Sequence, residues 1–313
     1  MILLTAAFFC GCTVLPPPPE PSRAPQAARM PPERTAVPAR RSTPRLETPL
    51  PPSPTPVPRV NAPWYRERNT ALFSLIQRDG CCASDAEIDA AIERMYIDPD
   101  KPMVALTFDD GPIPGVTDRI LDVLEQYNAR ATFFVCGWRF RDNDHVKSIA
   151  RRAVALGCEI GNHTWGHEDL QKLHNIVEKR RTLKDTNKAI FDATGFVARS
   201  FRPPGGHIDW DINHLARESG MAVVLWSQSG NVNETDPEKI AQNVQKQAVN
   251  GRELQDGDII LLHDTKPYMV NAVEIIVPQL LEEGYQLVTV WELLNCSEEG
   301  FVPGETYCCQ TLH

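Results

Sequence analysis

The chain has 313 residues, of which 42% are hydrophobic and 23% charged, and its formal net charge is −9. This length allows one domain with a tail or two small domains, and the apolar content is sufficient for a buried core. The acidic balance argues against a nucleic-acid-binding protein, because that class needs clustered Lys and Arg to neutralise phosphates.

The first segment, residues 1–15, begins with the apolar run MILLTAAFFCGC. A bilayer-spanning helix takes about 20 residues, so this run fits the hydrophobic part of a secretory signal better, although the usual basic start is missing. Gly11 and Cys12 resemble the end of a bacterial lipoprotein signal, in which the Cys is acylated. A lipid anchor, plain secretion and an ordinary cytoplasmic start stay open; we expect an extracytoplasmic protein of the cell envelope.

Residues 16–61 come next, and 16 of the 27 prolines lie between positions 16 and 58. Such a stretch has too few large apolar side chains to offset the entropy of ordering, which predicts a disordered, Pro-rich linker. Residues 62–100 contain short amphipathic segments near Thr70–Gln77 and Ala83–Tyr96, which predict a short helical extension of the folded body.

Nine cysteines are many for a cytosolic protein and fit an exported one. Cys136 and Cys158 lie inside apolar patterns and are expected to be small buried residues. The pairs at 81–82 and 308–309 flank the folded body and could bond across it, but the sequence does not give the connectivity. We assign residues 296–313 to a Cys-containing C-terminal tail.

Residues 101–295 alternate between strand and helix patterns. This alternation predicts an α/β fold with a parallel sheet covered by helices, either open or closed as an incomplete barrel. The expected strands are Met103–Phe108, Ala131–Val135, Glu159–Asn162, Ser200–Arg202, Ala222–Ser227, Asp258–His263 and Gln286–Val290. The expected helices are Thr117–Tyr127, Asp144–Leu156, Gln171–Ala193, Asp211–Ser219, Pro237–Val249 and Val270–Glu283.

Polar motifs follow four of these strands at their carboxyl ends, where active sites of parallel α/β folds form. Each motif alone has an ordinary explanation as a polar turn, a chance His pair, a solvated Arg or a structural His. Their joint occurrence predicts that they meet at one mouth. The motifs are Thr107–Pro112 (TFDDGP), His163–His167 (HTWGH), Arg202–Pro204 (RPP) and Leu261–His263 (LLH).

In this order the four motifs resemble the NodB homology domain of carbohydrate esterase family 4, the polysaccharide deacetylases, over residues 100–294. The resemblance implies a distorted (β/α)7 barrel and a monomeric enzyme that removes N-acetyl groups from a cell-wall polysaccharide. Two alternatives stay open: an esterase that removes O-acetyl groups from xylan-like sugars, and a metal-holding, glycan-binding module with little or no turnover.

The same residues suit one divalent metal. His163 and His167 are four positions apart, so on a helical turn both imidazoles would face one side, and Asp110 would supply an anionic third ligand. Zn²⁺ suits two nitrogens and one oxygen, although Co²⁺, Ni²⁺ or Mn²⁺ could occupy such a set. By resemblance, the neighbouring Asp109 is the general base.

The resemblance also assigns supporting roles. Arg202 would orient the base, and His263 would protonate the departing amine. Backbone N–H groups near Gly205 could stabilise an oxyanion, in a position where the family commonly has Tyr. Leu261 and Trp226 are candidates for the pocket that receives the acetyl methyl group, although Trp226 fits ordinary core packing nearly as well.

Asn231 is the nearest match to an Asp that the family pairs with the catalytic His. This departure puts in doubt the partner of His263 and the acetyl pocket, but not the metal ligands.

Overall fold

The computed structural model describes residues 97–98, 101–247, 251–296 and 300–310. All of these residues belong to one compact unit, Pro54–His313. The predicted signal and linker, nearly all of the extension at 62–100, and Cys81 and Cys82 lie outside the described residues. Within the described ranges, no helix combines the length and the apolar character needed to cross a membrane.

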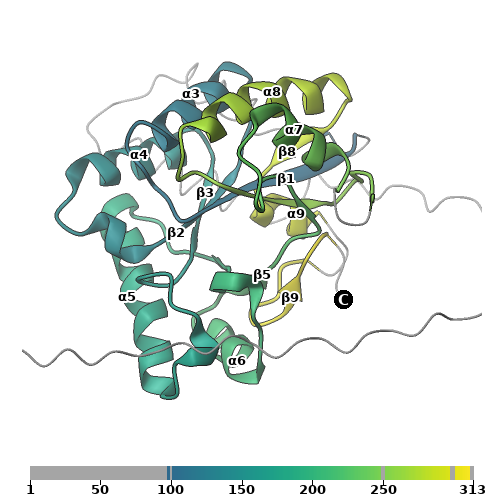
Figure 1. Ribbon diagram of the computed structural model, residues 1–313. Helices are drawn as coiled ribbons and strands as arrows, with labels where there is room; N and C mark the ends of the chain where they lie inside the picture. The colour runs from purple at the N-terminus through teal and green to yellow at the C-terminus, as the bar shows by residue number, and fades with distance from the viewer. Residues whose placement is uncertain (1–96, 99–100, 248–250, 297–299, 311–313) are drawn as a thin grey trace, which may run out of the picture. The chain divides into compact units, whose positions relative to one another are not determined.

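One sheet of nine strands organises the described part of the chain, and every pair of neighbouring strands in it is parallel (Figure 1). Ala105 of the central strand pairs with Ile259 on one edge and with Val288 on the other. The strands are β1 Met103–Asp109, β2 Thr132–Val135, β3 Glu159–Asn162, β4 Ser200–Phe201, β5 Ala222–Val224, β6 Gln228–Ser229, β7 Ile259–His263, β8 Gln286–Val288 and β9 Thr306–Tyr307.

The sheet curls because one segment, residues 222–229, pairs at both of its ends. β5 at its start pairs with β4, and β6 at its end pairs with β7. Between them the N–H of Leu225 donates to the carbonyl of Tyr307 and that of Ser227 to the carbonyl of Ile259. These bonds go to different strands, so the strand predicted at Ala222–Ser227 ends at Val224, and β6 begins only at Gln228, beyond the predicted range. The predicted distorted (β/α)7 barrel is confirmed as a curled, parallel half-barrel.

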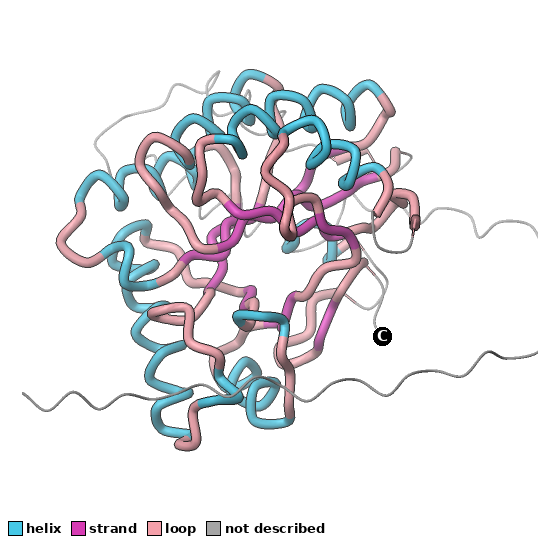
Figure 2. Tube along the Cα trace, in the orientation of Figure 1, coloured by secondary structure: helices cyan, strands magenta, loops and turns pink. Residues whose placement is uncertain are grey.

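Most of the helices follow the strands and lie around the outside of the sheet (Figure 2), whereas the last one, Val290–Asn295, packs in the core on the inner face. α3 packs against α4 and α8, α7 packs against α8, and α5 packs against α4 and α6. Their bounds are α3 Thr117–Gln126, α4 Asp144–Ala155, α5 Ile176–Thr194, α6 Trp210–Glu218, α7 Pro237–Gln245, α8 Tyr268–Glu282 and α9 Val290–Asn295, with short 3₁₀ turns η2 Gly137–Phe140, η3 Leu170–Lys172 and η4 Pro204–Gly206.

Strand alternation gives the sheet two buried faces. In β1, Val104, Leu106 and Phe108 belong to the large core beneath the helices, whereas Met103 and Ala105 belong to a smaller core inside the curl. Successive side chains of a strand point to opposite faces. The side chains of Thr107 and Asp109 therefore lie on the same inner face as Met103 and Ala105. The polar residues at the end of this strand thus face the interior of the half-barrel.

The helix predicted at Gln171–Ala193 begins later, at Ile176. Leu170–Lys172 forms a separate 3₁₀ turn, and Asn175 starts the helix by accepting the N–H of Val177 at 2.8 Å. At the other end Gly195 has a φ of 77°, the left-handed conformation in which glycine commonly ends a helix.

The strand predicted at Gln286–Val290 is also shorter than expected, because helix α9 begins at its last residue. Thr289 and Glu292 form a capping box, in which each side chain bonds the backbone N–H of the other. Arg130 contacts the same carboxylate at 3.1 Å in a buried ion pair. The Thr-x-x-Glu pattern is a helix-start signal that the apolar strand pattern conceals.

Residues 300–310, which the sequence analysis places in a tail, contribute β9. This strand pairs with β5, and Tyr307 within it is fully buried. Cys308 and Cys309 follow it and are half-buried, with their sulfur atoms 4.0 Å apart. The predicted burial of Cys136 and Cys158 is confirmed.

Candidate active site

Two adjacent aspartates end the central strand and face different surroundings. Asp109 is the last residue of β1, is 3% exposed and continues the inner face of the sheet. Asp110 has a φ of 77°, in the left-handed region, so the chain turns there and the second carboxylate leaves the strand direction. The N–H of Asp110 donates to the Phe134 carbonyl at 3.2 Å, and Arg139 Nε donates to the Asp110 carbonyl at 3.0 Å. These two bonds fix the turn.

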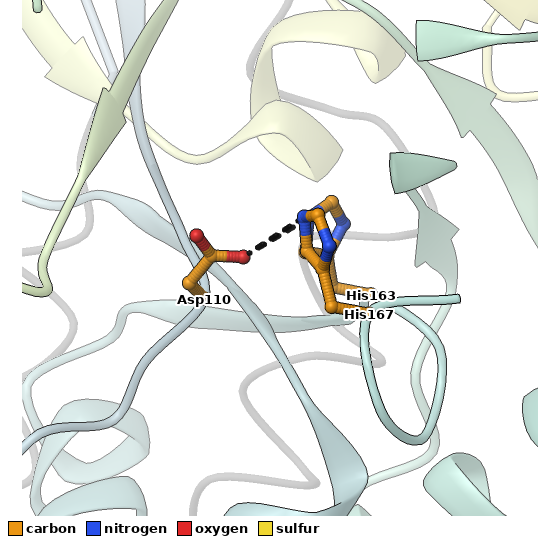
Figure 3. Close-up of side chains that lie close together, drawn as sticks. All are labelled: Asp110, His163 and His167. Atoms are coloured by element: carbon orange, nitrogen blue, oxygen red, sulfur yellow. Dashed lines mark ion pairs between the residues drawn. The ribbon is translucent and has the colours of Figure 1, made fainter. Parts of the chain in front are cut away.

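The turn after β3 brings His163 and His167 to Asp110. Their Nε2 atoms lie 3.5 Å and 3.3 Å from Asp110 Oδ1, and Figure 3 shows the carboxylate facing both rings. The helical turn predicted for this His pair is wrong. Thr164 and His167 have φ values of 63° and 62°, so a tight left-handed turn, not a helix, places the rings together.

Side-chain hydrogen bonds to the backbone hold this turn. Asn162 Oδ1 accepts the Thr164 N–H at 2.8 Å, and Glu168 Oε2 accepts the Gly166 N–H at 2.8 Å. Thr182 of helix α5 accepts the Trp165 N–H and donates to Glu168. Burial raises the pKa of Glu168, but these hydrogen bonds outweigh it and lower that pKa below the ordinary value.

The ring of His163 has its proton position fixed by a backbone carbonyl. His163 Nδ1 lies 2.7 Å from the carbonyl oxygen of Arg202, which can only accept. Nδ1 therefore carries a proton, and in the neutral ring Nε2, which faces Asp110, is the nitrogen that presents a lone pair. Ligating histidines are commonly oriented in this way by a partner on the other ring nitrogen.

Asp110, His163 and His167 fit a divalent metal ion by three observations. Their ligand atoms all lie within 4.8 Å of one another. Asp110 Oδ1 is buried and makes no hydrogen bond within the described residues, although a buried carboxylate oxygen ordinarily has a partner. Two imidazole nitrogens and one carboxylate oxygen also form a donor set of the kind that catalytic zinc sites use.

The electrostatics of this set are strongly coupled. Burial raises the pKa of Asp110, but the imidazoles of His163, His167 and His263 outweigh it and lower the pKa. Burial lowers the pKa of His163, but Asp109 and Asp110 outweigh it and raise the pKa. Both shifts favour the charged forms, a carboxylate at Asp110 and an imidazolium at His163, which attract each other. A bound cation would supply this positive charge in place of the imidazolium proton.

Arg202 binds Asp109 inside the half-barrel. It is fully buried, and its Nη1 donates to Asp109 Oδ1 at 2.8 Å and to Thr107 Oγ1 at 2.6 Å. The other guanidinium nitrogens donate to the carbonyls of Val224 and Leu225. Burial lowers the pKa of Arg202, and Asp109 opposes this effect. A guanidinium held at so many points fixes the orientation of the carboxylate.

His263 ends β7 beside Asp109, since these two residues pair in register. Its Nδ1 lies 3.0 Å from Asn231 Oδ1. An amide oxygen accepts, so Nδ1 carries the proton and Nε2 is left for the site. Asn231, which is 8% exposed, thus occupies the partner position that the sequence analysis suggested.

Asp264 follows His263 but does not contact its ring in any described hydrogen bond. Its carboxylate is fully buried, accepts from Thr117 Oγ1 at 2.5 Å and lies directly against Gly111 of the turn after β1. Burial, together with the charges of Asp110 and Asp109, raises its pKa to about 7. Through its contact with Gly111, the Asp264 side chain packs against the turn that carries Asp110.

The two candidates for the acetyl pocket, Trp226 and Leu261, and the oxyanion candidate Gly205 lie in different settings. A Cβ atom at Gly206 would lie 2.8 Å from the Trp226 ring, and the Arg202 guanidinium lies 5.8 Å from the centre of that ring, so Trp226 borders the site. Leu261 is 3% exposed and shares the inner face with His263 by alternation. Gly205 is exposed, with a φ of 74°.

Several supporting residues were missed by sequence reasoning. Asn162, Glu168 and Thr182 contact the turn that carries the His pair, yet none bears a catalytic side chain. A sequence signal exists for Asn162 and Glu168, which directly precede and follow the His163–His167 motif. Thr182 reaches the site from the middle of helix α5, which sequence alone does not place there.

Comparisons with known proteins agree with this geometry. The family model described as polysaccharide deacetylase matches residues 96–224. A peptidoglycan-N-acetylglucosamine deacetylase of Bacillus cereus is 37% identical over 198 residues, which cover 62% of this chain and 88% of that protein. The peptidoglycan-N-acetylmuramic acid deacetylase PdaC of Bacillus subtilis is 36% identical over 199 residues, which cover 63% of this chain but only 40% of PdaC.

Among solved structures, the chain is similar to a family 4 acetyl xylan esterase from Clostridium thermocellum in complex with a cobalt ion. The identity is 34% and the TM-score 0.59, and the match covers 67% of this chain and 100% of the esterase. The range matched by the family model, residues 96–224, includes three of the four strand ends that carry the site, those at Asp109, His163 and Arg202.

Proposed function

This chain belongs to the polysaccharide deacetylase family, carbohydrate esterase family 4, and on that premise we propose that it removes N-acetyl groups from a cell-wall polysaccharide with the help of one divalent metal ion. It is a hydrolase of amide bonds other than peptide bonds. The favoured substrate is the N-acetylglucosamine of peptidoglycan or of a chitin-like glycan.

One observation carries this proposal: Asp110 Oδ1 is buried without a hydrogen bond between the Nε2 atoms of His163 and His167. A carboxylate in this state is best explained by a cation that binds all three side chains. Zn²⁺ suits the set, and Co²⁺, Ni²⁺ or Mn²⁺ could replace it. When bound, the ion would acidify a water and polarise the acetyl carbonyl.

The chain's own residues provide the proton transfers. Asp109 is proposed as the general base, because Arg202 orients it and leaves Oδ2 free on the side of His163, 3.7 Å away. His263 is proposed as the general acid, since Asn231 fixes its ring and its Nε2 faces the site. The backbone N–H groups at Gly205, with Leu261 and Trp226, are proposed to hold the acetyl group.

The location and partners follow from this substrate. A cell-wall glycan lies outside the cytoplasm, so we propose an extracytoplasmic enzyme, secreted or held by a lipid at Cys12, that acts as a monomer. The acidic balance of the chain agrees with a glycan rather than a nucleic acid as partner.

A second candidate is the removal of O-acetyl groups from xylan-like sugars. Asn231 favours it, because a neutral amide supports a protonated His263 less than a carboxylate would, and an amide leaving group depends more on protonation than an alcohol does. A glycan-binding module with little turnover is the third reading, and the complete set of proposed catalytic residues argues against it.

Acetate release from peptidoglycan, chitin oligomers and acetylated xylan, each with and without a chelator, tests these proposals together. We expect release from an N-acetylated glycan that stops on chelation and returns with Zn²⁺ or Co²⁺. Release from xylan alone would favour the esterase. Binding without release from any substrate would support the binding module, and release from metal-free protein would exclude the metal.

A further inference from the structure

A groove outside the catalytic residues runs along helix α6. It has a volume of about 400 Å³ and is bounded by one face of that helix and by the segment before β9. Trp210, Asn213, His214 and Arg217 are spaced at intervals of three and four, so they share that helix face. Gly304 and Glu305 form part of the opposite wall.

The groove begins at an exposed aromatic platform. Trp210 is 75% exposed, and its ring is stacked on the imidazole of His214, with centroids 4.9 Å apart and an angle of 7° between the planes. The stack holds the indole in one orientation and leaves its second face to solvent. Ile208, which is 42% exposed, adds apolar surface beside it. A fixed, exposed, flat apolar surface is suited to a flat ligand with an apolar face.

The charges around the groove are already balanced by neighbours. Arg217 pairs with Glu305 at 3.0 Å, and Asp209, which caps helix α6, lies 3.9 Å from Lys179 Nζ. These groups offer hydrogen bonds but little net charge, so the groove suits a neutral ligand rich in hydroxyl groups. A pyranose has this character: apolar C–H faces for Trp210 and hydroxyl edges for the polar walls.

The groove is joined to the catalytic site by a short stretch of chain. Gly206 lies against Trp226 at the site, and Trp210 begins the groove four residues later. Four residues span at most about 14 Å when fully extended. A linear glycan with one sugar at the catalytic residues therefore reaches Trp210 within a few sugar units.

We propose that this groove binds further sugar units of the same polysaccharide that is deacetylated, with Trp210 as the stacking residue. The inference rests on the proposed function for its substrate class. The groove would make the enzyme prefer long glycans over short ones, because only long chains occupy both places.

Steady-state acetate release from the dimer and the hexamer of β-1,4-linked N-acetylglucosamine tests this inference in the full chain. For Trp210→Ala we expect kcat/KM on the hexamer to fall about three- to tenfold, chiefly through KM, because the stacking surface is lost; this fall corresponds to roughly 0.7–1.4 kcal/mol at about 1.4 kcal/mol per tenfold. Release from the dimer should not change, and Trp210→Phe should retain most of the hexamer activity.

Phe191→Ala is the matched control. Phe191 is also an exposed aromatic residue, 48% exposed, and it lies near the end of α5, remote from the strand ends that carry the site.

A readout that does not need turnover is the indole N–H resonance of Trp210 during titration of Asp109→Asn protein with the hexamer. A shift of this resonance by the hexamer supports the groove even if no substrate releases acetate, in which case the proposed function alone fails. Acetate release with equal effects of Trp210→Ala on dimer and hexamer, or no shift of the resonance, overturns the groove and leaves the proposed function intact.

Discussion

Asp109 and Asp110 are neighbours in the sequence, but one is held by Arg202 on the inner face of β1 and the other faces two histidines across a left-handed turn. Asp109→Asn should keep the metal and lose about 10²–10⁴-fold in turnover, the usual contribution of a general base. Asp110→Asn should lose the metal itself. Elemental analysis after dialysis, combined with acetate release, measures both. Loss of metal from Asp109→Asn would mean that the two roles are exchanged.

Asn231 stands where the related enzymes are expected to have a carboxylate, and it contacts His263 at 3.0 Å. The charged groups near this ring are Asp109 at the end of β1 and Asp110 in the turn after it, while Asp264 bonds Thr117 instead. Asn231→Asp would stabilise the protonated imidazole. The alkaline limb of the kcat/KM profile should therefore move to higher pH, and the acidic limb should stay nearly fixed. An unchanged alkaline limb would remove either Asn231 or His263 from the proton transfer.

Asp264 has a pKa of about 7, raised chiefly by burial from the ordinary aspartate value of 3.8. Between those pH values the folded protein keeps a proton that the unfolded chain releases, so this residue lowers stability as pH rises. Asp264→Asn removes the effect. The Tm of the variant minus the Tm of the wild type should therefore increase from pH 5 to pH 8.

Asp185→Asn is the control for this measurement, because it removes the same charge from an exposed position of α5. Its Tm difference from wild type should stay nearly constant over the range. Parallel behaviour of the two variants would show that Asp264 is not protonated in the folded protein.

At the scale of elements, local patterns carried most of the information. The alternation of apolar residues placed the strands, and the polar residues that follow them placed the motifs at one edge. Two of the errors have local causes that the apolar pattern does not contain. His163 and His167 were given a helical spacing, whereas Asn162 and Glu168 hold a left-handed turn there. Helix α9 was concealed because Val290 is both the last apolar residue of the strand pattern and the first of the helix.

Helix α9 depends on its first turn for stability. Thr289 accepts the Glu292 N–H at 3.2 Å, and Glu292 accepts the Thr289 N–H at 2.8 Å. Thr289→Ala removes one half of this box and should lower the free energy of unfolding by about 1 kcal/mol. Thr289→Ser keeps the hydroxyl and should restore most of it. Denaturant unfolding measures both, and equal losses in the two variants would show that the methyl group, not the cap, matters.

At the scale of the molecule, closure of the half-barrel was beyond sequence reasoning because it depends on contacts between distant segments. Residues 222–229 connect β4 to β7, and β9 arrives from a stretch that reads as a tail because it lacks a long apolar run. Arg202 likewise reaches Thr107 and Asp109 across the sheet. The barrel was predicted from the family resemblance. The pattern of residues alone was compatible with an open sheet as well.

Tyr307 tests whether β9 belongs to the cooperative fold. Its ring is fully buried, and its hydroxyl accepts the Val302 N–H at 3.0 Å and donates to the Gly300 carbonyl at 3.1 Å. Tyr307→Ala should lower the free energy of unfolding by about 3 kcal/mol or more, as large aromatic truncations in a core do. Tyr307→Phe keeps the ring and should lose only about 1 kcal/mol with the hydrogen bonds.

Val302→Ala is the control, because this side chain lies in the same segment and is 37% exposed. It should change stability little, and denaturant unfolding compares all three variants. Since β9 pairs with β5, and the backbone that follows β5 supplies the carbonyls that bind Arg202, loss of Tyr307 should also reduce acetate release. If Tyr307→Ala costs no more than Val302→Ala, residues 300–310 lie on the fold without stabilising it, and the catalytic unit ends before them.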